Sequence, residues 1–320
     1  MTVPKTKMAI DGILNVNKPE GKTSFAVVAW LKRLTRQKRV GHTGTLDPIA
    51  TGVLPVCFGQ ATRVTQFVTA SNKTYLAEIE LGRATDTFDR EGTITQWREP
   101  AAVTVAQVEE ALTAFQGSIE QVPPVYSALK HRGRRYYQLA RAGTPITPRP
   151  RRIEITSLDL VDCQLPFIAI RVECGKGTYI RSLAHDLGQY LGCGACLNNL
   201  TRLRCGPFRI EDALSLSQIK GAFEECAWKE LFHPIDSPLL GWRAAIVDET
   251  NASAIRNGRS LPLGEEASPT EEYCRVYSPD GDFIALLRFV SDKKLWHPEK
   301  VFPSSGFPAS QHPKALTRRI

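Results

Sequence analysis

The stretch "RVGHTGTLDPIATGVLPV" (Arg39–Val56) is dense in turn-forming residues and presents one carboxylate, Asp47. Its three glycines permit backbone conformations and close approaches that other residues resist. Taken alone, an aspartate before a proline is more often a turn or cap residue than a catalytic group. A catalytic interpretation of Asp47 therefore depends on what the rest of the chain supplies.

Segments around this stretch alternate between strand-like and helix-like patterns. Alternating apolar residues predict strands, and apolar residues three and four apart predict helices. We expect strands at 12–19, 73–82, 151–163, 167–175 and 200–210, helices at 22–36, 104–117 and 177–192, and a polar loop at 83–94. Thr104 and Gln107 are expected to form a capping box on the second helix, and Thr178 is the expected cap of the last. Strand pairs mixed with long helices favour an α+β fold with a mostly antiparallel sheet.

The chain has 320 residues, a length that suits two domains. The pattern changes near Pro234–Pro238 to short strands and glycine-rich turns, and "SPDG" (278–281) predicts a hairpin. We expect a main domain at 10–238, a small β domain at 240–302 and a flexible tail at 303–320.

The net charge is +8, and basic residues concentrate in two blocks, 31–39 and 129–153, neither of which contains an acid. The first block fits a solvated face as well as a nucleic-acid site. The second also carries two tyrosines, which favours nucleic acid. In it, Lys130, Arg132, Arg134 and Arg135 flank Gly133, a pattern that predicts a hairpin or loop tip that folds onto RNA.

Several other classes of protein are disfavoured. No run of about 18 apolar residues predicts a membrane helix, and the start lacks the apolar stretch of a secretory signal, so a cytoplasmic location is expected. No glycine-rich nucleotide motif is present. The C-x-x-C pair Cys193 and Cys196 lacks an obvious fourth ligand, so we expect neither a metal nor a cofactor.

Six segments resemble, in the same order, the TruB family of bacterial tRNA pseudouridine-55 synthases. They are "ILNVNKPEGKTS" (13–24), "GHTGTLDPIATGVLPVCFGQATR" (41–63), "KTYLAEIELGRATDTFDREG" (73–92), "QVPPVYSALKHRGRRYYQLARAG" (121–143), "CGKGTYIRSLAHDLGQYLG" (174–192) and "LTRLRCGPF" (200–208). The resemblance covers roughly 12–240. It implies the pseudouridine synthase fold, a mixed sheet flanked by helices, with a basic insert at about 121–152 and a PUA-like C-terminal domain.

The resemblance also assigns roles to individual residues. The catalytic residues are Asp47 as nucleophile, Arg181 as its partner, and Tyr75, which stacks on the target base and assists proton removal. The substrate-binding residues are Tyr179 and Leu200 in the base pocket, His42 in remodelling the tRNA loop, Lys18 near the site, and Arg202. Because arginine can hold a carboxylate ionised by paired hydrogen bonds, we expect a bidentate fork from Arg181 to Asp47.

The implied activity is isomerisation of uridine 55 in the T-arm of tRNA, by base flipping, in a monomer without an obligate protein partner. Two alternatives stay open from the sequence. One is a related synthase that acts on another RNA, and the other is a non-catalytic tRNA-binding or folding factor. The sequence does not decide whether Asp47 attacks the ring or the sugar, or whether the C-terminal domain binds RNA.

Overall fold

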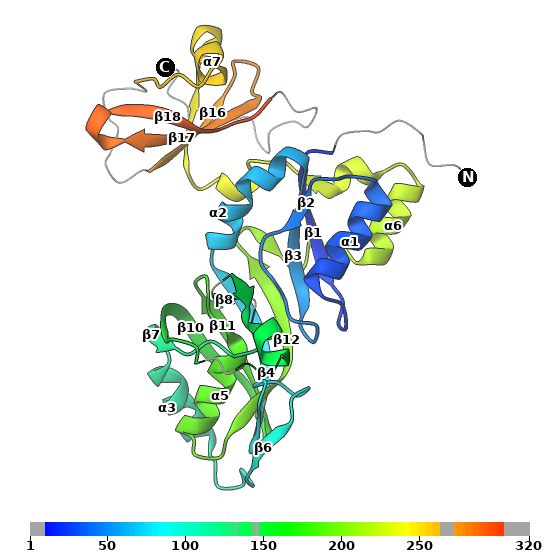
Figure 1. Ribbon diagram of the computed structural model, residues 1–320, viewed down its shortest axis with the longest axis vertical. Coiled ribbons are helices and arrows are strands. Elements are labelled where there is room, and N and C mark those ends of the chain that lie inside the picture. Colours follow the sequence, from blue (N-terminus) through cyan, green and yellow to red (C-terminus); the bar gives the residue numbers. More distant parts are fainter. Residues whose placement is uncertain are drawn as a thin grey trace.

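The computed structural model describes residues 10–303 except 128, 132, 143, 145, 146 and 263–271. Its main feature is a central sheet of ten strands (Figure 1). Eight of them follow one another across the sheet in the order β14 (Phe232–His233), β1 (Gly12–Lys18), β3 (Thr51–Phe58), β12 (Ala195–Cys205), β4 (Lys73–Leu81), β11 (Phe167–Cys174), β10 (Arg151–Gln164) and β7 (Gly117–Gln121). The short strands β2 (Val40–His42) and β13 (Phe208–Arg209) pair with β3 and β12.

The sheet consists of two antiparallel halves that meet at one parallel contact, between β3 and β12. Only two residue pairs make this junction, Thr51 with Thr201 and Gly52 with Arg202. Gly52 has φ +96°, and a Cβ there would lie 2.3 Å from the Arg202 carbonyl oxygen. Glycine is therefore required where the halves join. The expected mixed, mostly antiparallel sheet is confirmed.

Helices cover the sheet and enclose one large apolar core. Figure 1 shows α1 (Ser24–Thr35) and α6 (Leu216–Glu224) beside the half that contains β1, and α3 (Val105–Ala114) and α5 (Ile180–Tyr190) beside the other half. The remaining helices are α2 (Thr65–Ala70), α4 (Tyr136–Arg141) and α7 (Glu249–Arg256).

The predicted helix caps are correct in one case and wrong in another. In α3, the Thr104 side chain accepts from the Gln107 backbone N–H, and the Gln107 side chain accepts from the Thr104 backbone N–H, as a capping box requires. In α5, the residue before the helix is Tyr179, which makes no side-chain cap. The Thr178 hydroxyl instead donates to the Gly175 carbonyl, so Thr178 closes the preceding turn.

The segment 83–94, expected to be a polar loop, begins and ends in short strands. β5 (Arg83–Thr85) pairs with β6 (Ile94–Trp97), and only the turn between them is irregular. The helices α2, α4, α6 and α7 were not predicted. α7 is only eight residues long and lies in a region whose pattern is otherwise strand-like.

A second, four-stranded sheet forms the C-terminal part of the chain, as expected. It contains β15 (Arg243–Ile246), β16 (Tyr273–Tyr277), β17 (Phe283–Val290) and β18 (Leu295–Val301). The hairpin predicted at 278–281 joins β16 to β17, where the Gly281 N–H donates to the Ser278 carbonyl. No helix in the described ranges is long and apolar enough to cross a membrane.

Candidate active site

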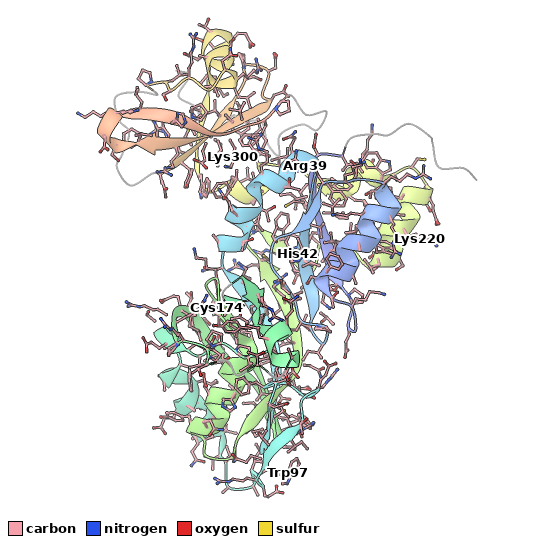
Figure 2. The ribbon with its side chains drawn as sticks, viewed as in Figure 1. Arg39, His42, Trp97, Cys174, Lys220 and Lys300 are labelled. Atoms are coloured by element: carbon pink, nitrogen blue, oxygen red, sulfur yellow. The ribbon has the colours of Figure 1, made fainter. Side chains whose placement is uncertain are left out.

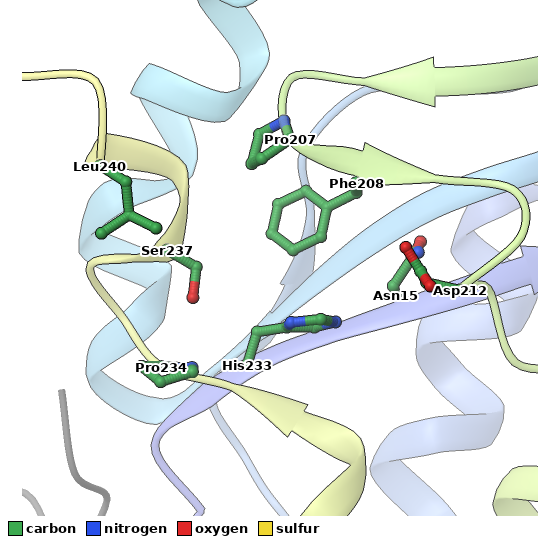
Figure 3. Close-up of a pocket in the computed structure, with 8 residues that line it drawn as sticks. All are labelled: Asn15, Pro207, Phe208, Asp212, His233, Pro234, Ser237 and Leu240. Carbon is green, nitrogen blue, oxygen red and sulfur yellow. The ribbon is translucent and has the colours of Figure 1, made fainter. Parts of the chain in front are cut away.

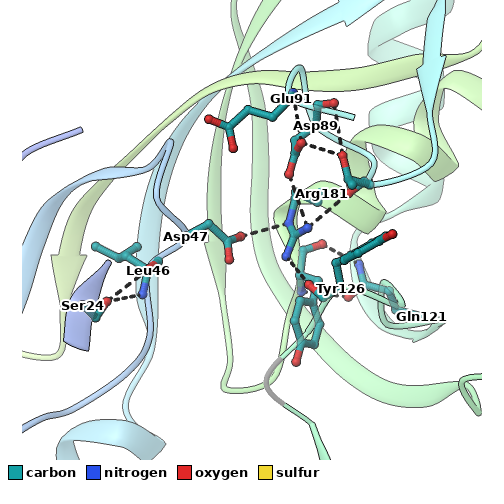
Figure 4. Close-up of polar contacts among 10 residues, drawn as sticks. Ser24, Leu46, Asp47, Asp89, Glu91, Gln121, Tyr126 and Arg181 are labelled. Atoms are coloured by element: carbon teal, nitrogen blue, oxygen red, sulfur yellow. Dashed lines mark hydrogen bonds and ion pairs between the residues drawn. The ribbon is translucent and has the colours of Figure 1, made fainter. Parts of the chain in front are cut away.

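Asp47 lies in the loop between β2 and β3, and the backbone before it is held by a buried serine. Ser24, the first residue of α1, accepts a hydrogen bond from the Leu46 N–H at 2.8 Å and donates to the Leu46 carbonyl at 3.2 Å (Figure 4). The Ala50 N–H closes a turn on the Asp47 carbonyl at 3.1 Å. The carboxylate direction is therefore set by a turn anchored on a helix end.

Lys18 holds the backbone on the other side of Asp47. Its ammonium is buried and donates to the carbonyls of Pro19, Lys22 and Pro48. Burial lowers the pKa of Lys18 to about 8, against the opposing pull of the negative charges of Asp47 and Glu20. These contacts make Lys18 a residue that positions the Asp47 loop, and its three donors are already occupied by backbone.

Arg202, predicted to bind substrate, is buried instead and only 1 % exposed. Its Nε donates to the Val53 carbonyl at 2.6 Å, and its Nη2 to the Gly44 carbonyl at 3.3 Å. The guanidinium therefore holds both ends of the Asp47 loop against β12. These hydrogen bonds give Arg202 a positioning role that the sequence did not predict, and its direct contact with substrate stays a prediction.

Arg181, on α5, reaches Asp47 from the opposite half of the sheet (Figure 4). Its Nε lies 2.9 Å from Asp47 Oδ2, and the two side chains are 6 % and 36 % exposed. The expected bidentate fork is not formed. The Nη groups bind elsewhere: Nη1 lies 3.3 Å from Asp89 Oδ2, and Nη2 donates to the Tyr126 carbonyl at 2.8 Å. Asp47 thus receives one charged contact, and its other oxygen remains accessible to a substrate.

Asp89 is a site residue that our sequence analysis missed. It lies in the turn between β5 and β6 and is buried. Its Oδ1 accepts from the Thr87 hydroxyl at 2.6 Å and from the Glu91 N–H at 3.2 Å, while Oδ2 faces Arg181. The only available signal was its place inside the TruB-like segment 73–92, which does not reveal a partner 92 residues away.

The turn that carries Asp89 is stacked against α5. The Phe88 ring lies on the His185 ring, with centroids 4.0 Å apart and planes 17° from parallel. Phe88 has φ +63°, a conformation that costs a bulky residue free energy and that persists when surrounding contacts compensate for it. The stack therefore fixes the turn that presents Asp89 to Arg181.

The start of the basic insert is attached to the N-terminus of α5. The Gln121 side chain both accepts from the Tyr179 N–H at 2.8 Å and donates to the Tyr179 carbonyl at 3.1 Å. Val122, the next residue of the insert, accepts through its carbonyl from the Ser182 hydroxyl in the first turn of α5 at 2.7 Å. Tyr179 is half-buried beside Arg181, and burial raises the pKa of its hydroxyl.

Tyr75 and Leu200 lie on the adjacent strands β4 and β12 and are almost fully buried. Burial raises the pKa of Tyr75 to about 12, while the neighbouring Arg202 guanidinium acts in the opposite direction. In the β4–β12 pairing, Tyr75 is opposite Arg202 and Leu200 is opposite Ala77. Tyr75, predicted to stack on the base, and Leu200, predicted to line its pocket, thus lie close to Arg202, which holds the Asp47 loop.

His42 ends β2, five residues before Asp47, and its Nδ1 accepts from the Gly44 N–H at 3.3 Å. Figure 2 shows His42 beside the central strands, with Arg39 closer to the C-terminal sheet. His42 therefore lies on the same loop as the candidate nucleophile and is partly exposed.

The predicted basic hairpin is present as two short strands, β8 (Lys130–His131) and β9 (Arg134–Arg135). Gly133 has φ +84° and makes the turn. Arg134 is exposed. Arg132 and the side chains of Lys130 and Arg135 lie outside the described residues, so their contacts with RNA stay predictions.

One cavity and the C-x-x-C cysteines take no part in the contacts described for Asp47 and Arg181. The cavity in Figure 3 is lined by Asn15, Pro207, Phe208, Asp212, His233, Pro234, Ser237 and Leu240, none of which is a predicted site residue. Cys193 and Cys196 are buried free thiols. Among the described residues, no group of three or more histidine, cysteine, aspartate or glutamate side chains could hold a metal ion.

Comparisons with known proteins agree with this geometry. A family model described as TruB family pseudouridylate synthase (N terminal domain) matches residues 32–180, and one described as tRNA pseudouridylate synthase B C-terminal domain matches 181–240. A protein named tRNA pseudouridine synthase B from Dehalococcoides mccartyi (strain BAV1) is 44 % identical over 92 % of this chain and 97 % of its own length. A protein of the same name from Clostridium kluyveri is 45 % identical over 87 % of this chain and 95 % of its own.

Among solved structures, a chain from the crystal structure of a Cbf5-Nop10-Gar1 complex matches with a TM-score of 0.71 and 26 % identity, over 95 % of this chain and 87 % of that chain. The resemblance inferred from the sequence motifs is thereby confirmed. The chain belongs to the TruB family of pseudouridylate synthases, which are isomerases.

Proposed function

We propose that the chain converts uridine 55 in the T-arm of tRNA into pseudouridine. The observation that carries the proposal is the ion pair between Asp47 and Arg181, formed across the junction of the two sheet halves. The relatives named tRNA pseudouridine synthase B, similar over nearly their whole length, support tRNA as the substrate.

The reaction exchanges one bond of the nucleotide for another. The bond from C1′ of the sugar to N1 of the ring breaks, the ring rotates, and C1′ bonds to C5. C5 releases its proton and N1 takes one up, so no electrons enter or leave. Arg181 holds the Asp47 carboxylate in place, and that carboxylate acts as the nucleophile. Attack on the ring and attack on the sugar would both use this carboxylate.

The target base must leave the RNA stack before Asp47 can reach it. We propose that Tyr75, Tyr179 and Leu200 receive the flipped base and replace its lost stacking. A hydroxyl whose pKa is about 12 is protonated at neutral pH. Tyr75 therefore acts chiefly as a stacking surface. It would accept the C5 proton only after losing its own proton, and the neighbouring Arg202 charge favours that phenolate form.

The RNA arm extends beyond this pocket. We propose that His42 remodels the tRNA loop and that the hairpin residues Lys130, Arg132, Arg134 and Arg135 bind phosphates. The catalytic domain comprises 10–238, with its insert at about 121–152, and a PUA-like domain comprises 240–302. The enzyme would act as a cytoplasmic monomer without an obligate protein partner.

The two alternatives have less support. A synthase for another RNA would fit the structural similarity to the chain from the Cbf5-Nop10-Gar1 complex. The sequence identity to that chain is 26 %, however, against 44 % to a relative named tRNA pseudouridine synthase B. A purely RNA-binding factor would not need Asp47, Tyr75 and Arg181 together.

The test is release of tritium from a T-arm hairpin labelled at C5 of its uridines. We expect release equal to the pseudouridine found by nucleoside analysis, and none from a hairpin with cytidine at position 55. Tight binding without release would favour the non-catalytic factor. Release from a different RNA alone would favour the related synthase.

A further inference from the structure

A second ion pair crosses the junction beside Asp47 and Arg181. Arg90 directly follows Asp89 in the β5–β6 turn, and its Nη2 contacts Glu20 in the loop between β1 and α1. That loop also touches the Asp47 turn, because the Gly21 N–H donates to the Pro48 carbonyl at 2.9 Å. Glu20 therefore lies on a loop that contacts the Asp47 turn, and Arg90 lies next to Asp89, which contacts Arg181.

Arg90 has one partner on its own side of the junction and one on the opposite side. Its Nη1 donates to Asn199 Oδ1 on β12 at 2.6 Å, and Asn199 Nδ2 donates to Glu78 Oε1 at 2.8 Å. The turn itself is fixed to β12, since the Arg90 N–H donates to the Leu197 carbonyl at 2.9 Å. The Asn199 contact orients the guanidinium without neutralising it.

Glu20 is the partner that can be exchanged. Its side chain is 53 % exposed, on a loop whose next three residues are also exposed, whereas the Arg90 side chain is 30 % exposed. Exposed ion pairs contribute little to stability, so another anion can replace Glu20 at little cost. A backbone phosphate has two non-bridging oxygens, which a guanidinium can bind in the same paired geometry as a carboxylate.

We propose that Arg90 binds a backbone phosphate next to the target uridine, and that Glu20 occupies this position until RNA displaces it. The inference rests on the proposed function, which brings an RNA strand to Asp47. Arg90 would stay oriented by Asn199 during the exchange, so the phosphate meets a guanidinium already in place. Glu20 then acts as a competing anion that lowers affinity.

The test compares charge variants in binding of an unlabelled T-arm hairpin over a range of salt concentrations. Arg90→Ala should weaken binding at low salt by roughly three- to tenfold and flatten the log–log salt dependence by about one unit. Glu20→Gln should tighten binding by about two- to fivefold. Arg90→Lys should keep the salt slope, which separates loss of charge from loss of structure.

The control is Glu224→Gln, which neutralises the acid of another exposed ion pair, with Lys220 on α6, and should leave binding unchanged. The proposal is overturned if Glu20→Gln weakens binding as Arg90→Ala does, because the pair would then be a structural link. An unchanged salt slope in Arg90→Ala would also overturn it. If wild type binds the hairpin but forms no pseudouridine, the proposed function fails while the binding comparison still tests Arg90.

Discussion

Asp47 presents a single carboxylate, 36 % exposed, beside the buried side chains of Arg181 and Asp89. Asp47→Asn keeps the shape of the residue and removes the charge and the proposed nucleophile. We expect product formation to fall below detection, while tRNA affinity changes by no more than a few-fold, because one carboxylate adds little to a large RNA interface. Tritium release under single-turnover conditions, alongside hairpin binding, measures both. Clear turnover by a variant shown by mass spectrometry to retain asparagine would exclude Asp47 as nucleophile.

Arg181→Lys tests whether charge alone is enough at the second catalytic position. The guanidinium contacts Asp47, Asp89 and the Tyr126 carbonyl at once, and a single ammonium cannot span all three. Asp89, which is buried, would lose its cationic partner at a cost of about 3 kcal/mol. We therefore expect both a lower melting temperature and a loss of at least about a hundredfold in the chemical step. A lysine variant with near wild-type rate would show that the three-way contact is dispensable.

Contacts such as these show where inference from the sequence stops. Asp47 and Arg181 could be assigned because each lies in a long motif. The Asp89 contact could not, because its partner is remote in sequence and no local pattern encodes it. For the same reason, the burial of Arg202 and the three carbonyl contacts of Lys18 became visible only in three dimensions.

At the scale of elements, local patterns predicted best where they are long and capped. The helices α1 and α3 and the paired strands β10 and β11 follow from periodicity and capping residues. The strands β5 and β6 were missed because strands of three and four residues are too short to show a detectable alternation. Their pairing is established by tertiary contacts, such as the stack of Phe88 on His185.

The loops around Asp47 should show a pH-dependent contribution from Lys18. The pKa of Lys18 is about 8 in the folded protein and 10.5 in its unperturbed state, so between these values the unfolded chain binds more protons. The cost of burying its charge is therefore full below about pH 8 and is relieved as pH rises toward 10.5. Lys18→Met lacks this titration and also leaves carbonyls unpaired.

We expect the free energy of unfolding of wild type, relative to Lys18→Met, to increase with pH across this window by about 1 kcal/mol per pH unit. Urea denaturation of both proteins at pH 7.5 and pH 9.5 measures the difference. A difference that does not change with pH would mean that Lys18 titrates outside this range.

The basic hairpin β8–β9 is an element whose role can be separated from the chemistry. Replacement of Arg132, Arg134 and Arg135 by alanine removes up to three phosphate contacts. We expect the apparent Michaelis constant to rise and the salt dependence of binding to flatten by about two to three units, with little change in turnover at saturation. Binding of tRNA from low to moderate salt checks this. If the slope of the triple variant equals that of wild type, the hairpin is a solvated loop.

At the scale of the whole molecule, the C-terminal sheet is packed against the catalytic part through a shared apolar cluster. Val53, Val68 and Phe208 of the central-sheet region pack with Leu286 and Phe302 of the C-terminal part. The Arg63 guanidinium lies 5.2 Å from the centre of the Phe302 ring and also donates to the Val301 carbonyl. The two parts are therefore joined by a core, which favours a fixed orientation between them.

Three buried polar side chains also link the central sheet to the C-terminal sheet. The Tyr277 hydroxyl donates to Asp236 Oδ2 at 2.8 Å and accepts from Arg275 Nη1 at 2.7 Å, and all three residues are at most 5 % exposed. Asp236 belongs to the segment that leaves the central sheet, whereas Arg275 and Tyr277 lie on β16. Tyr277→Phe removes the hydroxyl that joins two buried charges, which leaves both with a missing partner.

We expect Tyr277→Phe to lower the free energy of unfolding by about 2–4 kcal/mol and to separate unfolding of the C-terminal sheet from that of the central sheet. Differential scanning calorimetry should show one transition for wild type and two for the variant. Tyr273→Phe changes the same residue type at the partly buried start of the same strand and keeps the ring contacts with Phe67 and Trp242, so it should retain one transition. Because Asp47 and Arg181 lie outside the contact between the central and C-terminal sheets, turnover on the T-arm hairpin should persist below the first transition. A single, unshifted transition in Tyr277→Phe would mean that the apolar cluster alone holds the two parts together.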